Sequence, residues 1–421
     1  MTEEQRHRTV FYGWWIVLAS LLCTLLFSGI GFFSFTFFVT PLQDEFGWSR
    51  GVVMAGFTVW SLVVAAASPL VGKVVDRYGV KLVISLGAFI SGLGLILLSR
   101  MSSLWHLYVL YGILGVGLAA MGPIPATGVV SNWFRRHRGI AIGIASTGIG
   151  GGGFLLAPLV GYLIGSFGWR TTYLVLGALI WILVIPVTLL VMKTKPSDME
   201  LLPFGAEAAE KACDKEHPAH GTAAPPKPLA SLSFWLISFT YFASGFAIVG
   251  ILQNQAPYLE DIGLPLGMAA AVIGSFGLMS AIGKIIFGLL CDRISVKYAS
   301  AIGITLQTIG LIILMRIRFS TGVGVLWLYA IVLGFGSGSW LPTMSILVSS
   351  NFGLTSYGAV FGMANLIHYV GTAIGPLMAA FIYDATNTYY WAFTVFLVLY
   401  LTAIPAVLAI RAPLKQKSNR S

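Results

Sequence analysis

The sequence Gly72-Lys-Val-Val-Asp76-Arg77-Tyr-Gly79-Val-Lys81 places one acid among three bases in a short turn between two long apolar stretches. The same turn returns in the second half of the chain as Gly288-Leu-Leu-Cys-Asp292-Arg293. Pro41 and Pro257 are separated by the same number of residues as these two turns. A slightly larger separation in sequence relates four further pairs: Gly115 with Gly334, Pro123 with Pro342, Ser131 with Ser350 and Gly139 with Gly358. A nearly constant offset in corresponding stretches indicates an internal duplication of the chain.

The composition excludes an ordinary water-soluble enzyme. Of the 421 residues, 57% are hydrophobic and only 10% are charged, whereas a soluble domain carries about 25% charged residues. Twelve apolar stretches are each long enough to cross the hydrocarbon core, about 30 Å thick, as a helix. They cover residues 12–39, 51–73, 80–100, 104–131, 138–164, 169–192, 231–259, 266–290, 297–317, 322–350, 356–382 and 388–410. The first stretch is too long for a signal-peptide core, so we expect the protein to retain it.

One polar segment, residues 193–230, interrupts this pattern. It holds five basic residues, six acidic residues and six prolines, a composition that predicts a flexible linker. We therefore predict an all-α integral membrane protein with twelve transmembrane helices in two parallel six-helix repeats. The expected domains are an N-terminal bundle (1–192), a cytoplasmic linker (193–230) and a C-terminal bundle (231–421).

The distribution of the charged residues predicts the orientation in the membrane. With the N-terminus inside, 19 of the 25 Lys and Arg residues fall on the cytoplasmic side, five fall outside, and Lys284 lies within a span. The positive-inside rule then places both termini in the cytoplasm of a multi-pass protein of the cell membrane. The net charge of +10 is explained by this orientation in a lipid bilayer, and nucleic acid is not expected as a partner.

The repeated turn predicts a gate. An acid beside bases at neighbouring helix ends can form ion pairs that hold one face of a transporter closed, and Gly72 would permit close helix packing; the alternative is a basic loop that only sets orientation. Together with the twelve spans, this turn resembles the loop signature of the major facilitator superfamily, over the whole chain. The expected gating residues are Gly72, Asp76, Arg77, Arg138, Asp292 and Arg293.

A second stretch, Phe134-Arg-Arg-His-Arg138-Gly-Ile-Ala141-Ile-Gly143-Ile-Ala145-Ser-Thr-Gly148, resembles the fifth-helix signature of the monocarboxylate transporters within that superfamily. Tyr12-Gly13-Trp14-Trp15 partly matches their first-helix signature. Phe33-Ser-Phe-Thr-Phe-Phe-Val-Thr-Pro41 is similar to the end of the first helix in the oxalate:formate antiporters, a neighbouring branch. These resemblances imply transport of a small organic anion.

Two other patterns do not indicate binding sites. Gly148-Ile-Gly150-Gly-Gly-Gly153 matches G-x-G-x-x-G, but a dinucleotide site needs a preceding strand and an acid about 20 residues later. We expect this run to allow close helix packing, and we expect no cofactor. Cys213, His217 and His220 have loosely metal-like spacing, but no fourth ligand lies nearby, so a solvated linker without a metal is expected.

Lys284 is the one Lys, Arg, Asp or Glu that lies away from the ends of a predicted span. It precedes Asp292 by eight residues, about 12 Å along a helix, too far for its stem to reach the surface easily. A central lysine costs about 2.5–3.5 kcal/mol on insertion into the membrane. We expect its counter-ion to be an anionic substrate, with Ser280 on the same face; a neutral lysine, or one satisfied by carbonyls and water, is the alternative.

His368 lies near the middle of the eleventh span and can carry a proton near neutral pH. The alternative is a histidine bonded to a neighbouring helix. Asn365, three residues earlier on the same face, could orient a ligand. Asn254, Trp340 and Phe33 are weaker binding candidates, because each could equally be a packing residue.

The resemblance implies roles for three of these positions. Monocarboxylate transporters have an Asp in the eighth helix and, four residues later, an Arg that binds the substrate carboxylate; these fall on Ser280 and Lys284. A lysine in the eleventh helix of the oxalate:formate branch, a second cationic contact, falls on His368. In this chain Lys284 therefore offers a point charge where the Arg would offer a bidentate fork. Ser280 stands in place of the Asp that would be the proton partner, and His368 makes the second positive charge dependent on pH.

These features predict a secondary transporter of a small organic anion, best fitted by a monocarboxylate, that works by alternating access with proton symport or anion exchange. The runner-up is a proton-coupled exporter of drugs or metabolites, since Gly153-Phe-Leu-Leu-Ala157-Pro158-Leu-Val-Gly161 resembles the antiporter motif of that group. A cationic drug would need an acid within the membrane, and the spans contain none. A membrane enzyme or a sensor is disfavoured, because the sequence shows neither a clustered catalytic set nor a signalling domain.

Overall fold

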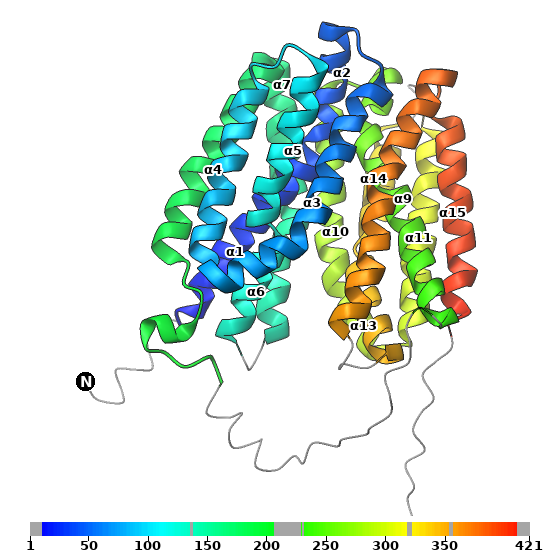
Figure 1. The fold of residues 1–421 in the computed structure, drawn as a ribbon. Coiled ribbons are helices and arrows are strands. Elements are labelled where there is room, and N and C mark those ends of the chain that lie inside the picture. The colour runs from blue at the N-terminus through cyan, green and yellow to red at the C-terminus, as the bar shows by residue number, and fades with distance from the viewer. Residues whose placement is uncertain are drawn as a thin grey trace, which may run out of the picture. The chain divides into compact units, whose positions relative to one another are not determined.

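The computed structural model describes residues 11–134, 138–205, 229, 231–317, 322–352 and 357–410. Within these ranges the chain is almost entirely helical (Figure 1). The helices are α1 (Gly13–Ser28), α2 (Phe35–Phe46), α3 (Arg50–Tyr78), α4 (Val80–Leu98), α5 (Leu104–Met121), α6 (Pro123–Trp133), α7 (Arg138–Val191), α9 (Leu232–Asp261), α10 (Leu266–Arg293), α11 (Val296–Arg316), α12 (Val323–Ser337), α13 (Trp340–Phe352), α14 (Tyr357–Thr386) and α15 (Tyr390–Leu408). A π-helical turn, η2 (Gly29–Phe33), joins α1 to α2, and η3 (Pro196–Met199) is a 3₁₀ turn.

The predicted number of membrane spans is confirmed. Eleven segments within the described residues are long and apolar enough to cross a membrane. One of them, Ile140–Val191, is 52 residues long and consists of two helices joined at Gly168, whose φ of 77° favours glycine. Because this segment crosses twice, the protein is an all-α membrane protein with twelve spans.

Three of the predicted spans are interrupted within their length. The first contains the π-helical turn η2, a feature that is common at functional positions in helices. The fourth is divided into α5 and α6 at Gly122, and Pro123 begins α6. Proline has no N–H group, but at this position the N–H would have no partner within the helix, so no hydrogen bond is lost. The tenth is divided into α12 and α13 by Gly338 and Ser339, so the second repeat has its break close to the corresponding place.

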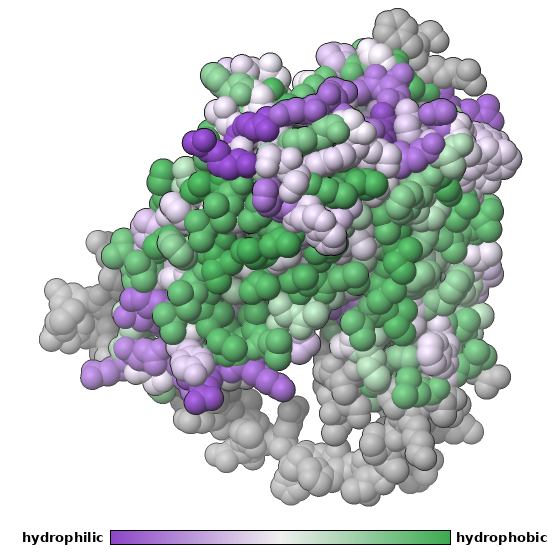
Figure 2. Space-filling model, turned by 45° about the horizontal axis from the view of Figure 1, so that its top comes forward, coloured by the Kyte–Doolittle hydropathy of each residue, from purple (hydrophilic) through white to green (hydrophobic). Residues whose placement is uncertain are grey.

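The surface of the helices is apolar where a membrane would cover it. Leu190 and Ile182 on α7 and Trp105 on α5 are exposed, with relative accessibilities of 77%, 70% and 75%. On the face seen in Figure 2, apolar side chains cover the middle of the helices and hydrophilic residues gather near their ends. This distribution is expected of helices whose solvent is lipid rather than water.

The contacts divide the chain into two compact units. Unit 1 contains residues 1–46, 55–221 and 266–277, and unit 2 contains residues 47–54, 222–265 and 278–421. Each unit therefore includes a short segment from the other half of the sequence. These segments are the start of α3, which belongs to unit 2, and the first turns of α10, which belong to unit 1.

Unit 1 is built on close packing of α1 against α7. A Cβ atom at Gly152 would lie 2.6 Å from the backbone nitrogen of Gly29, and one at Gly148 would overlap the hydroxyl of Thr24. The Thr24 hydroxyl donates a hydrogen bond of 2.5 Å to the carbonyl of Ala145. The glycine run thus brings two helix backbones together, and the prediction that it serves packing is confirmed.

Unit 2 is built around α9, which packs against α14 and α15. Gly371 and Gly375 of α14 face the α9 backbone at Phe242 and Phe246, with no room for a Cβ atom at either position. The α9 helix also contacts α13, and α11 packs on α12, α13 and α15. Unit 2 holds all the predicted binding residues except Phe33.

Candidate substrate-binding site

Lys284 lies on α10 where that helix meets the break between α12 and α13. A Cβ atom at Gly338 would lie 2.6 Å from both the backbone nitrogen of Lys284 and the carbonyl oxygen of Ser280. Gly283, the residue before Lys284, approaches the carbonyl of Phe335 too closely for any side chain. The backbone that carries Lys284 is therefore pressed against the α12–α13 junction by glycines on both sides.

The Lys284 side chain is half-buried and has no partner in the described part of the chain. The ion pairs there are Arg50 with Asp261 and Arg170 with Glu45, and no hydrogen bond from the Lys284 ammonium is present among those residues. Burial of a charge without a partner is costly, so a neutralising group from outside the chain would be favourable. The site can therefore attract an anion.

His368 is held in a defined orientation by two neighbouring helices. Its Nδ1 atom lies 2.7 Å from the backbone carbonyl of Tyr241 on α9, and its ring stacks on Trp340 of α13 with centroids 4.6 Å apart and an interplanar angle of 16°. A Cβ atom at Gly245 would lie 2.5 Å from Nδ1, so the absence of a side chain there makes room for the ring. His368 is 5% exposed.

The hydrogen bond to Tyr241 sets the tautomer of His368. A carbonyl oxygen only accepts, so Nδ1 must carry the proton, and the neutral ring then presents an acceptor at Nε2. Some side-chain polar atoms of the described residues are both buried and without a hydrogen-bond partner, and Nε2 is not one of them. One ring nitrogen of His368 is thus bonded to a neighbouring helix, and the proton-carrying role expected of the other stays a prediction.

Tyr241 connects His368 to the helix that carries Trp340. Its hydroxyl lies 2.7 Å from the Thr343 hydroxyl on α13 and 3.3 Å from the Ser300 hydroxyl on α11. Tyr241 thus contacts His368 through its carbonyl and the first turn of α13 through its ring. The sequence did not distinguish Tyr241, Gly245 or Thr343 from other core residues, because their roles depend on contacts between distant helices.

Ser280 and Asn365 flank the two ionisable residues as expected. Ser280 is 8% exposed and lies one turn before Lys284 on α10. Asn365 is half-buried on α14, three residues before His368, and its amide has no hydrogen-bond partner within the described residues. Its donors and its acceptor remain available to a ligand.

Asn254 and Phe33 are placed differently from this group. Asn254 is fully buried, and its amide donates to the carbonyls of Gly250 at 2.9 Å and Pro376 at 3.1 Å, which ties α9 to α14. Phe33 ends the π-helical turn in unit 1 and packs against Phe276, with ring centroids 6.2 Å apart. Both residues have packing roles in the structure.

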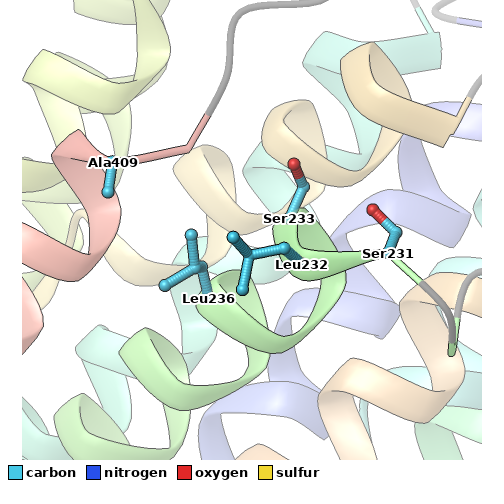
Figure 3. A pocket seen from close by; sticks show the side chains of 5 residues that line it. All are labelled: Ser231, Leu232, Ser233, Leu236 and Ala409. Carbon is cyan, nitrogen blue, oxygen red and sulfur yellow. The ribbon is translucent and has the colours of Figure 1, made fainter.

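A pocket at the start of α9 contains none of the predicted residues. It has a volume of about 250 Å³ and is lined by Ser231, Leu232, Ser233, Leu236 and Ala409. Figure 3 shows the leucine side chains and the two serine hydroxyls around it. It lies at the beginning of α9, whereas Tyr241 and Gly245, which position His368, lie farther along this helix.

The predicted gating residues lie near the ends of α3 and α10 and at the start of α7. Cβ atoms at Gly72 and Gly288 would meet no atom of the described residues within 4 Å, so the close helix packing expected at Gly72 is not found among them. Arg77, Asp292 and Arg293 are exposed and belong to neither ion pair among the described residues. The side chains of Asp76 and Arg138 lie outside the described residues.

Comparison with known sequences assigns the family. The model of the Major Facilitator Superfamily matches residues 21–367 and 230–421. Monocarboxylate transporter 11 of Homo sapiens is 29% identical over 341 residues, which cover 77% of this chain and 67% of that protein. Monocarboxylate transporter 12 of Homo sapiens is 26% identical over 418 residues, covering 91% and 77%. An uncharacterised MFS-type transporter of Bacillus subtilis, YcxA, is 25% identical and covers 89% and 90%.

Comparison with solved structures shows the same fold. A bacterial homologue of the human lysosomal transporter Spinster, in an inward-facing and occupied conformation, has a TM-score of 0.73 at 16% identity, covering 95% of this chain and 97% of that one. A D-xylose–proton symporter also has a TM-score of 0.73 at 16% identity, covering 96% and 99%. These relatives are membrane transporters and not enzymes, and this chain belongs to the major facilitator superfamily.

Proposed function

We propose that this transporter carries a small organic anion, with a monocarboxylate as the best-fitting substrate. The observation that carries the proposal is Lys284, a half-buried cation without a partner among the described residues, on a membrane-spanning helix. The relatives named monocarboxylate transporters support the same substrate class. Lys284 would hold the carboxylate as a compact point charge, with Ser280 one turn away as a hydrogen-bond donor.

His368 supplies the proton-linked part of the proposal. Its Nε2 atom is the acceptor that remains after Nδ1 bonds to Tyr241, so protonation at Nε2 would create a second positive charge without breaking that bond. Proton uptake and anion binding would then favour each other, which is the basis of symport. If His368 stays neutral during transport, Lys284 alone balances the anion and exchange of one anion for another is expected.

The orientation follows from the distribution of charges along the chain. With both termini in the cytoplasm, the turns that contain Arg77 and Arg293 face the cytoplasm, and the protein would lie in the cell membrane. Arg77, Asp292 and Arg293, together with Asp76 and Arg138, would form the cytoplasmic gate when the transporter closes on that side.

Uptake into proteoliposomes tests this function. A panel of labelled carboxylates of increasing length and charge would define the substrate class for the unmodified protein. We expect Lys284→Ala to abolish uptake of the preferred anion, and Lys297→Ala, which removes a lysine at the start of α11, to leave it unchanged. Unchanged anion uptake by Lys284→Ala would overturn the assignment.

A further inference from the structure

The pocket at the start of α9 lies at the level where two membrane-spanning helices end. The helices α9 and α15 pack against each other within unit 2, and the spans that they form are Leu232–Asp261 and Tyr390–Leu408. The lining of the pocket includes Ser231, the residue before the first of these spans, and Ala409, the residue after the second. The pocket therefore lies at the boundary between the hydrocarbon of a bilayer and its polar headgroups.

The lining of this pocket has an apolar part and a polar part. Leu232 and Leu236 of α9 extend toward Ala409 of α15, and the hydroxyl oxygens of Ser231 and Ser233 point to the same side of the view (Figure 3). Serine at the position before a helix normally accepts a hydrogen bond from the first turn, but the Ser231 side chain makes no such bond. Neither serine hydroxyl has a partner among the described residues, so both can donate to a ligand that carries acceptor oxygens.

The pocket is too small to enclose a whole ligand of ordinary size. Its volume is about 250 Å³, whereas pockets that enclose a small molecule measure about 300–1,000 Å³. The side chains beside it are apolar and exposed: Leu232 is 70% exposed, Trp235 is 52% exposed and Leu408 is 38% exposed. A molecule with its polar end in this pocket would therefore have its remainder on a surface that the acyl chains of a bilayer cover.

Trp235 supports this depth in the membrane. Its indole N–H donates a hydrogen bond of 2.9 Å to the carbonyl of Leu229, which precedes α9. Tryptophan is enriched at the membrane–water interface, because its ring is apolar while its N–H needs a polar partner. The orientation of Trp235, with its N–H toward the polar end of α9, is the one expected at that interface.

The chain that continues from the pocket is basic in sequence. Residues 411–421 lie outside the described residues, and their sequence contains Arg411, Lys415, Lys417 and Arg420 and no acid. A cluster of four or more bases directly after a membrane span is typical of segments that attract anionic lipids. The five residues that line the pocket are uncharged, so these bases, none more than ten positions from Ile410, supply the preference for a ligand with net negative charge.

We propose that the pocket between the start of α9 and the end of α15 binds the headgroup of an anionic phospholipid. The phosphate oxygens accept hydrogen bonds from the hydroxyls of Ser231 and Ser233. The glycerol and the first methylene groups contact Leu232, Leu236 and Ala409, and the acyl chains continue along the exposed apolar side chains of the two helices. This site shares no residue with the proposed substrate site, and it does not depend on which substrate the protein carries.

Photocrosslinking of the purified full chain in mixed micelles tests the lipid site. The probe is a phosphatidylglycerol with a diazirine at the start of one acyl chain, and mass spectrometry locates the crosslinks. We expect crosslinks at the start of α9 and the end of α15. The double variant Ser231→Ala with Ser233→Ala should lower their yield by about tenfold or more, because two hydrogen bonds to a charged group are lost.

Ser295→Ala is the matched control for the double variant. Ser295 precedes α11 as Ser231 precedes α9, and it also lacks a side-chain capping bond, but it does not line the pocket. The crosslink yield at the pocket should be unchanged in this variant. Ala409→Leu, which fills the pocket and keeps both serines, should lower the yield as the double variant does.

Competition distinguishes a bound anionic lipid from a free phosphate and from the general lipid around the helices. Excess unlabelled phosphatidylglycerol should remove the crosslinks, whereas phosphatidylcholine or glycerol 3-phosphate at the same concentration should leave most of them. Equal competition by glycerol 3-phosphate would mean a phosphate site without lipid, and equal competition by phosphatidylcholine would mean unspecific lipid contact. Either result, or an unchanged yield in the double serine variant, would overturn the proposal. The yield is measured without substrate, so a failed substrate assignment does not affect it.

Discussion

Lys284 occupies a position where a charge needs a partner. A lysine at the centre of a membrane helix costs about 2.5–3.5 kcal/mol, and no described acid offsets that cost. The absence of a side chain at Gly338 lets the α12–α13 junction lie directly against the Lys284 backbone. A carboxylate beside the ammonium would supply the missing charge, which explains why the site should prefer an anion to a neutral analogue of the same shape.

His368 should couple transport to protons through Nε2. The substitution His368→Gln keeps a donor for the Tyr241 carbonyl but removes Nε2, the ring nitrogen that would accept the proton. We expect exchange of labelled for unlabelled anion to continue, while the acceleration of uptake by an inward proton gradient is lost. His106→Gln, at an exposed position in the first turn of α5, is the control. Proton-driven uptake that survives in His368→Gln would contradict this role.

Single residues were predicted from the sequence only where their chemistry conflicts with the membrane. Lys284 and His368 stand out because ionisable groups are rare in apolar spans. Tyr241 and Gly245 do not stand out, since a tyrosine and a glycine are common in membrane helices. Arg50 does not stand out either: it is 6% exposed and paired, and its partner Asp261 is distant in sequence.

The contact between α9 and α14 should control the position of His368. A Cβ atom at Gly245 would lie 2.5 Å from Nδ1, so Gly245→Ala should displace the ring and cost about 1–3 kcal/mol through overpacking. We expect lower uptake together with a lower midpoint of thermal unfolding. Gly362→Ala on α14, where a Cβ atom meets nothing within 4 Å, should stabilise by about 0.5–1 kcal/mol. Equal behaviour of the two variants would show that the contact is unimportant.

The contact between α1 and α7 offers a comparison of adjacent glycines. A Cβ atom at Gly152 would overlap the Leu25 carbonyl and lie 2.6 Å from the Gly29 nitrogen, whereas one at Gly151 would lie 3.8 Å from a Leu25 methyl group. We expect Gly152→Ala to destabilise unit 1 by about 1–3 kcal/mol and Gly151→Ala to be neutral or slightly stabilising. Thermal unfolding in detergent measures both. A stable Gly152→Ala variant would mean that the helices separate easily.

At the scale of the whole molecule, the sequence predicted the spans and the repeat better than the contacts. The twelve apolar stretches match the helices, including the division at Gly168, because length and hydropathy are local properties. The close packing expected at Gly72 is absent among the described residues, because packing at a helix end depends on contacts between elements and not on local hydropathy. The same limit applies to Arg50, whose partners Asp261, Asp384 and Tyr389 are distant in the sequence.

Direct binding of a carboxylate to the purified protein is the most decisive test of the role of Lys284. Titration calorimetry in detergent, with the anion that the uptake panel identifies, compares the unmodified protein with Lys284→Ala and Lys284→Arg. We expect Lys284→Ala to weaken binding by at least about tenfold, equivalent to about 1.4 kcal/mol, and Lys284→Arg to retain binding because it keeps the charge. An unchanged affinity in Lys284→Ala, with the variant folded, would contradict the assignment of Lys284 as the residue that binds the substrate.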